Sequence, residues 1–83
     1  FDGNAGWERH LAGDEIVQIL AGATELDVIA DDEFSTLELK AGMLVVMPRG
    51  CWHRFRSQAG VTVMTATPRG DEEHAHVDDP RNL

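Results

Sequence analysis

The sequence has few of the residues that would cross-link a small domain or let it enter a membrane. Cys51 is the only cysteine among 83 residues, so a disulfide within the chain is excluded, and a lone cysteine suits a reducing compartment. No apolar run approaches the roughly 20 residues of a membrane helix, and no signal-peptide pattern is present. These absences predict a cytoplasmic protein with no membrane partner.

Basic residues are also scarce. Seven lysines and arginines stand against 15 aspartates and glutamates, which gives a formal net charge of −8. A surface that binds nucleic acid would be basic, so the balance predicts no nucleic-acid partner. Much of the acid lies in short runs at 31–33, 71–73 and 78–79, which are typical of solvated turns and tails.

The length allows one domain with a thin core. A chain of this size buries only roughly 60% of its unfolded surface, and small domains usually gain stability from a disulfide, a metal or a partner subunit. Because the disulfide is excluded, a metal and oligomerisation remain, and we expect a homodimer that covers an apolar sheet face. The sequence begins with Phe1 rather than methionine, as expected of a trimmed or partial product.

Short runs of alternating apolar residues, separated by glycine or acidic turns, predict seven strands and no helix. The runs span residues 7–11, 15–20, 24–29, 34–40, 43–47, 52–56 and 61–67. Many short strands without room for crossover helices indicate an all-β, single-domain antiparallel β-barrel or jelly roll. We expect the barrel domain to span residues 1–68. Residues 69–83 form a polar acidic tail, mobile or laid across the barrel.

Some details of this barrel can also be predicted. Ala21-Gly22-Ala23 is expected to be a turn between two strands. The three methionines, Met43, Met47 and Met64, are expected in the core. Trp7 and Trp52 flank candidate ligands, and they either pack in the barrel or an interface, or line a ligand pocket.

Four residues of metal-ligand type lie in or beside the predicted strands. Glu8 and His10 are two residues apart, so on a strand both side chains point to the same face. Glu15 begins a strand whose inward positions are apolar, and a carboxylate there is neutral or bound to a cation. With His53 from a later strand, the four residues would form a nitrogen and oxygen cage for a divalent metal.

The spacing of these residues resembles the two motifs of the cupin family. The first motif reads His-x-His, three or four residues, Glu, six residues, Gly, and the second reads Gly, five residues, Pro-x-Gly, two residues, His, three residues, Asn. This sequence has Glu8-Arg9-His10, Glu15 and Gly22, then Gly42, Pro48-Arg49-Gly50, His53 and Ser57. The spacing agrees in both motifs, and the resemblance covers about residues 4–68. It implies a small single-domain cupin barrel.

The resemblance implies that His10, Glu15 and His53 bind the metal. Glu8 stands where the family usually has its first histidine, and Ser57 stands where it often has asparagine. Glu8 could be a fourth ligand, could contact the other ligands without binding the metal, or could turn away and leave three ligands. Iron, manganese, nickel, zinc and copper all tolerate these ligand types.

The other polar residues near the motifs have simpler interpretations. Arg9, Arg54 and Arg56 alternate away from the ligands, toward solvent or an interface. Cys51 shows no arrangement that would make it a nucleophile. His74-x-His76 resembles a metal pair, but such pairs arise in tails by chance.

Two classes of function compete, and a third remains open. The first is a metal-dependent enzyme, such as a dioxygenase, isomerase or lyase that acts on a small oxygen-rich molecule. The second is a module that binds or senses a small molecule without chemistry. The third is a metal-free barrel whose polar residues hold a ligand or water. The sequence does not identify the substrate.

Overall fold

The computed structural model describes residues 3–4, 6–67, 70, 72–75 and 79–82. In these residues, eight strands and one short 3-10 helix follow one another. They are β1 (Gly3–Asn4), β2 (Trp7–His10), β3 (Glu15–Ala30), β4 (Glu33–Lys40), β5 (Leu44–Met47), β6 (Trp52–Ser57), β7 (Val61–Ala66), β8 (Glu72–Ala75) and η1 (Pro80–Asn82).

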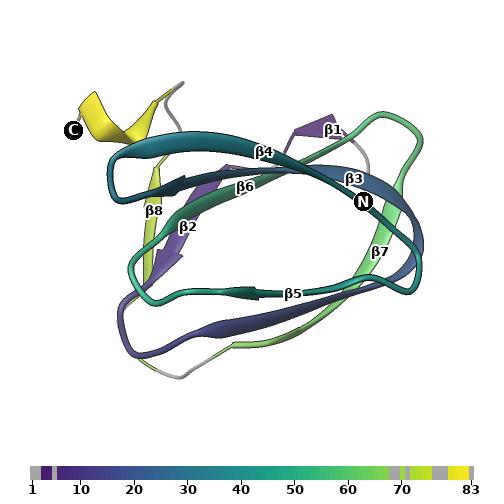
Figure 1. Ribbon diagram of the computed structural model, residues 1–83, viewed down its shortest axis with the longest axis horizontal. Helices are drawn as coiled ribbons and strands as arrows, with labels where there is room; N and C mark the ends of the chain where they lie inside the picture. Colours follow the sequence, from purple (N-terminus) through teal and green to yellow (C-terminus); the bar gives the residue numbers. More distant parts are fainter. Residues whose placement is uncertain (1–2, 5, 68–69, 71, 76–78, 83) are drawn as a thin grey trace.

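The strands form two layers that share β3. The large layer has the order β4-β3-β6-β2-β8, with β1 beside β6, and the small layer places β5 and β7 on either side of the first half of β3. All of these pairings are antiparallel. Figure 1 shows β3 running along one layer, curving, and returning along the other. The predicted all-β antiparallel barrel is therefore confirmed.

Strand β3 is longer than predicted. The expected turn at residues 21–23 is wrong, because the chain continues as one strand of 16 residues with a register shift between Ile19 and Ala21. Gly22 has a φ of +80°, and a Cβ added there would lie 2.4 Å from the carbonyl oxygen of Gly60. A glycine bulge bends a strand without ending it. The bend carries β3 from the small layer into the large one.

The space between the layers is filled by one apolar cluster. Alternate residues of β3, among them Val17, Ile19 and Leu26, are almost fully buried, and Phe55 of β6 packs with them. Side chains alternate between the two faces of a strand, so Glu15 and His53 share this inward face. The barrel interior is thus apolar along most of β3 and polar where that strand begins.

A second cluster covers the outer face of the large layer. Trp7, Ile29, Trp52 and Ala75 are buried there. The guanidinium of Arg9 lies 4.6 Å from the Trp52 ring and that of Arg54 lies 4.5 Å from the Trp7 ring, which are cation–π distances. Both tryptophans alternate with the candidate ligands of their strands, so they pack outside the barrel interior rather than line it.

Asp27 lies on this same outer face and is fully buried, which its sequence context does not indicate. Its side chain is 0% exposed and forms ion pairs with Arg54 at 2.8 Å and with Arg56 at 2.7 Å. Thr36 of β4 donates a further hydrogen bond of 2.8 Å. Arg54 and Arg56, which were expected to face solvent or an interface, are therefore partly buried counter-ions of Asp27.

The outer face of the small layer, in contrast, is apolar and exposed. Its register places Ile16 opposite Val46 and Ala66, and Gln18 opposite Leu44 and Met64. The large exposed side chains of this apolar face are Ile16, Leu20, Leu44, Val46 and Met64. Met64 and Met43 are 56% and 39% exposed, so the prediction of three core methionines is wrong for these two. Met47 alone of the three is buried.

Part of the expected tail belongs to the sheet. Strand β8 pairs along its whole length with β2, and η1 docks through a hydrogen bond from Arg81 to the carbonyl oxygen of Asp32. The domain boundary at residue 68 stays a prediction, and His76 lies outside the described residues. Within the described part of the chain, no helix has the length and apolarity to cross a membrane.

Candidate metal centre

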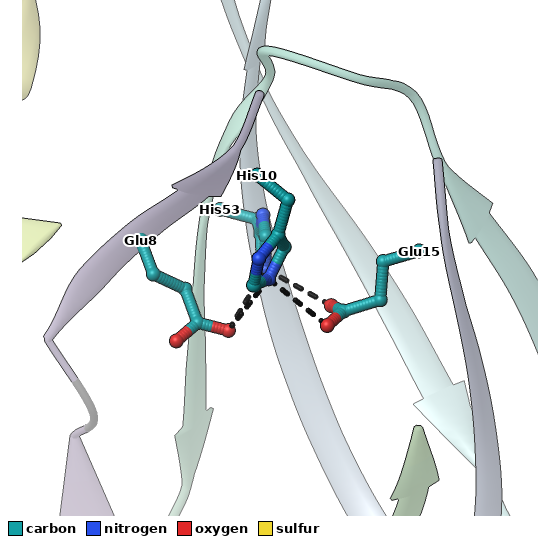
Figure 2. A group of neighbouring side chains, drawn as sticks. All are labelled: Glu8, His10, Glu15 and His53. Atoms are coloured by element: carbon teal, nitrogen blue, oxygen red, sulfur yellow. Dashed lines mark hydrogen bonds and ion pairs between the residues drawn. The ribbon is translucent and has the colours of Figure 1, made fainter. Parts of the chain in front are cut away.

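Three strands bring the four predicted ligands together. Glu8 and His10 come from β2, His53 lies directly opposite Glu8 on β6, and Glu15 begins β3. One nitrogen or oxygen atom from each lies within 4.8 Å of those of the others. Figure 2 shows the two carboxylates on either side of the two imidazoles. The predicted constellation is thus a cluster in space.

Three of the four side chains of the cluster are buried, and the fourth is partly exposed. The side chains of His10, Glu15 and His53 are 5%, 3% and 1% exposed, whereas that of Glu8 is 33% exposed. Solvent therefore contacts the cluster at Glu8 rather than at the three buried residues. The residue that departs from the family pattern is thus the most exposed of the four.

The distances within the cluster suit a single ion. His10 Nε2 lies 3.0 Å from Glu15 Oε2, and His53 Nε2 lies 3.2 Å from both Glu8 Oε1 and Glu15 Oε1. Nitrogen and oxygen ligands lie about 2.0–2.2 Å from zinc, so neighbouring ligands around one ion are about 3.0–3.5 Å apart.

The hydrogen bonding of the cluster is incomplete among the described residues. Both ring nitrogens of His10 and Glu15 Oε1 are buried and make no hydrogen bond of acceptable geometry. Buried polar groups without a partner cost free energy, about 1–3 kcal/mol each. A divalent cation in the cluster would satisfy His10 Nε2 and Glu15 Oε1, so the residues present fit a metal.

The tautomer of His53 is fixed by the backbone. Its Nδ1 lies 3.2 Å from the carbonyl oxygen of Cys51, to which it donates, and this leaves Nε2 facing the two carboxylates. Burial by itself lowers the pKa of His53, but Glu15, Glu8 and the Cys51 carbonyl outweigh it and raise the pKa to about 9. Without metal, His53 is therefore an imidazolium at neutral pH.

Both carboxylates are held ionised. The hydrogen bond with His53 is the largest effect on Glu8 and lowers its pKa. Burial raises the pKa of Glu15, but His53 and Thr67 reverse this, and the net pKa is lowered. Thr67, just after β7, donates a hydrogen bond of 2.6 Å to Glu15 Oε2. Ionised carboxylates are the form that binds a cation.

These shifts predict how the metal-free protein responds to pH. A raised histidine pKa contributes stability that is complete below the unfolded value of 6.5 and is lost as pH rises through about 9. With a chelator present, the melting temperature should fall between pH 6.5 and pH 9.5. Thermal melts of wild type and His53→Gln would test this, since the variant lacks the titrating group. Parallel pH profiles would contradict the assignment.

One residue that contacts the site, Thr67, was not predicted, whereas two of the site's polar neighbours in sequence behave as expected. Thr67 closes a predicted strand, and nothing local indicates that it contacts Glu15. Asp14 accepts a hydrogen bond from the backbone N–H of Arg49 and acts as a turn residue, as its position indicates. Burial raises the pKa of the Cys51 thiol, which agrees with its lack of a nucleophilic role.

A cavity of about 600 Å³ is lined by residues that include Thr24, Lys40 and Ser57, and it shares no residue with the cluster. Its buried hydroxyls are already paired, Thr24 with the Arg56 carbonyl and Ser57 with the Ala23 carbonyl. These two hydroxyls are therefore satisfied within the protein, unlike the buried polar atoms of the cluster.

Comparison with known proteins gives a consistent assignment of family. A family described as Cupin domain matches residues 2–67. Acireductone dioxygenases from two strains of Rhodopseudomonas palustris are 39% identical over 67 residues, which is 81% of this chain and 40% of theirs. The chain thus spans less than half the length of these curated relatives.

Solved structures show the same architecture. A cupin-2 domain containing protein from Shewanella frigidimarina is 28% identical, with a TM-score of 0.64 over 83% of this chain and 64% of that one. Hydroquinone 1,2-dioxygenase from Sphingomonas sp. TTNP3, solved with 4-hydroxybenzoate bound, has a TM-score of 0.69 over 84% of this chain and 56% of that one. At 18% identity the latter supports the fold alone.

Proposed function

Because the chain belongs to the cupin family, we propose that it binds one divalent metal ion inside its barrel, together with a small oxygen-rich molecule. The proposed ligands are His10, Glu15, His53 and Glu8. The observation that carries the proposal is the buried two-histidine, two-carboxylate cluster with incomplete hydrogen bonding. Two neutral imidazoles and two carboxylates would also neutralise a divalent ion.

We propose dioxygenase or isomerase chemistry as the reaction class. A metal at this site would supply Lewis acidity, or dioxygen activation if it is iron. The three buried ligands exclude water from one side, so the substrate would approach on the side of Glu8. Glu8 Oε1 faces the histidines, which would leave the other oxygen, Oε2, to accept a proton from a substrate hydroxyl. The similarity to acireductone dioxygenases supports this class.

The second candidate function is a binding or sensing module without chemistry. It is favoured by the extent of the match, since the chain corresponds to only 40% of the length of the acireductone dioxygenases. An activity that needs the rest of those proteins would be absent here. A metal-free module is also compatible with the ion pairs between His53 and the two carboxylates.

Metal content and turnover distinguish these functions. Protein purified without chelators should contain about one divalent ion per chain by elemental analysis. Fe²⁺, Mn²⁺, Ni²⁺, Zn²⁺ and Cu²⁺ would then be loaded separately, and oxygen uptake measured with enediol, catechol and hydroquinone substrates. A protein that neither contains nor takes up any of these ions would overturn the metal site, whereas a loaded protein that binds substrates without turnover would favour the binding module.

We also propose that the protein is a homodimer that buries the apolar face of the small layer. The chain carries a net charge of −8, so two copies repel one another. A contact through an uncharged surface brings the fewest like charges together. The exposed apolar residues of this face, which include Ile16, Leu44 and Val46, provide such a surface. A two-fold interface would place the same face of each copy together.

Leu44→Glu should convert the dimer to a monomer, because each copy would bring a charge into the apolar contact. Light scattering coupled to size exclusion would measure the mass. Ser35→Glu adds the same charge to an exposed position of β4 in the large layer and should leave the dimer intact. A wild-type protein that is monomeric at micromolar concentration would contradict the interface.

The remaining expectations stay predictions. We propose a cytoplasmic location and a small-molecule partner, with neither nucleic acid nor membrane as a partner. The acidic balance of the chain, 15 acidic against 7 basic residues, supports the first of these exclusions.

A further inference from the structure

Strand β8 lies along β2 at the open edge of the candidate metal centre. Its register places Glu72 directly opposite His10 and His74 directly opposite Glu8. Directly paired residues of antiparallel strands project from the same face of the sheet. Glu72 and His74 are therefore on the side of the cluster, while Glu73 projects to the outer face and pairs with Arg9 at 2.8 Å. Figure 1 shows β8 beside β2.

The two histidines of the cluster differ in how their outer nitrogen is held. His53 donates from Nδ1 to the backbone carbonyl of Cys51. His10 makes no such backbone bond among the described residues, and its Nδ1 is buried without a hydrogen bond. The acceptor nearest to it in the described contacts is Glu72 Oε1, at 3.5 Å. The Glu72 carboxylate thus lies near Nδ1 of His10, as the Cys51 carbonyl lies near Nδ1 of His53.

We propose that Glu72 is the positioning residue of His10. By accepting a hydrogen bond from Nδ1–H, the Glu72 carboxylate fixes the tautomer of His10 in which the Nε2 lone pair faces Glu15 and Glu8. It also makes the imidazole more basic, which strengthens its bond to a metal. The inference rests on the proposed metal binding and adds to it a residue from outside the family motifs.

The energetics favour this role. His10 is only 5% exposed, so its Nδ1 cannot rely on bulk water, whereas the Glu72 side chain is 42% exposed and has room to move. A shift of a few tenths of an ångström would bring the 3.5 Å contact into hydrogen-bonding range. Closing that contact removes the cost of a buried unpaired donor.

Binding of Co²⁺, measured by competition with a chromophoric chelator, would test the role of Glu72. Glu72→Ala should weaken Co²⁺ binding about 10- to 100-fold, the range found when such outer partners are removed. Glu72→Gln, which keeps an acceptor oxygen without the charge, should fall between this variant and the wild type. Glu73→Ala is the matched control, because it removes the same charge and an ion pair from β8 without touching His10.

Proton NMR of the Co²⁺ form separates positioning from a general effect of charge. The Nδ1 protons of both metal-bound histidines give shifted, exchangeable signals. In Glu72→Ala one signal should be lost to solvent exchange while the His53 signal persists. Equal affinities for Glu72→Ala and Glu73→Ala, or two retained signals, would overturn the role of Glu72. A wild type that binds no Co²⁺ would instead overturn the proposed metal site itself.

Discussion

Replacing His53 with alanine is expected to abolish the metal content of the purified protein. The side chain is 1% exposed, faces both carboxylates, and is one of the four proposed ligands, which come from three strands. Structural zinc sites bind with about 10–16 kcal/mol, so one ligand of four contributes about 3 kcal/mol. Such a loss would weaken binding of added ion by roughly two orders of magnitude. Elemental analysis and chelator competition would measure both effects.

The same variant should lose the stabilisation that metal confers. An ion present at 100 times its dissociation constant stabilises the folded state by about 2.7 kcal/mol. In a domain of this size that raises the melting temperature by roughly 10–20 °C. His53→Ala also leaves a cavity, so the quantity to compare is the rise on adding metal, not the absolute melting temperature.

His74→Ala is the control for this experiment. His74 is 54% exposed and lies 3.9 Å from Glu8, beside the cluster but not in it. The His74→Ala variant should keep the full rise in melting temperature on adding metal. If His53→Ala shows the same rise as the wild type, His53 is not a ligand.

Asp27→Asn is expected to be the most destabilising change away from the metal centre. The carboxylate is fully buried and accepts hydrogen bonds from Arg54, Arg56 and Thr36. Removing one partner of a buried ion pair costs about 3–5 kcal/mol. Here Arg54 would lose its carboxylate partner and Arg56 would keep only the exposed Glu25. The cost is a large part of the roughly 5–15 kcal/mol that stabilises a typical domain. Urea unfolding would measure the loss.

Glu25→Gln is the matched control for Asp27→Asn. Glu25 pairs with the same arginine, Arg56, at 2.8 Å, but its side chain is 49% exposed. Exposed ion pairs contribute about 1 kcal/mol or less. If the two variants lost equal stability, burial of Asp27 would not be the source of the effect.

Asp27→Asn should also differ from the wild type in its response to acid. Burial raises the pKa of Asp27, but hydrogen bonds from Arg56, Arg54 and Thr36 outweigh it, and the net pKa lies below the ordinary 3.8. A lowered carboxyl pKa contributes stability that is present above the ordinary value and is lost as pH falls through the folded one. The wild type should therefore lose this contribution below about pH 4, and Asp27→Asn should not.

The candidate metal cluster was predictable from the sequence because short-range spacing and the resemblance to both cupin motifs point to the same residues. Glu8 and His10 share a face by strand alternation, and glycine and proline set the turns that lead to Glu15 and His53. The role of Glu8 could not be predicted from the sequence, because the exposure of its side chain depends on the strand beside it. The structure places Glu8 in the cluster, as its most exposed member.

The features that could not be predicted depend on pairings between segments far apart in the sequence. Whether Gly22 ends a strand or bends it depends on the close approach of Gly60, which no local pattern indicates. Asp27 is buried only because β6 places two arginines next to it. The pairing of β8 with β2 joins segments more than 60 residues apart, so Glu72 could not be assigned to His10 from spacing.

The bend in β3 has a consequence for how the protein opens. Within the described residues, β3 is the one strand hydrogen-bonded in both layers, to β4 and β6 in one and to β5 and β7 in the other. Neither layer can separate from the other while β3 keeps its partners. Amide hydrogen exchange along β3 should therefore report one shared opening free energy on both sides of Gly22. The barrel is then a single cooperative unit, with no layer that unfolds alone.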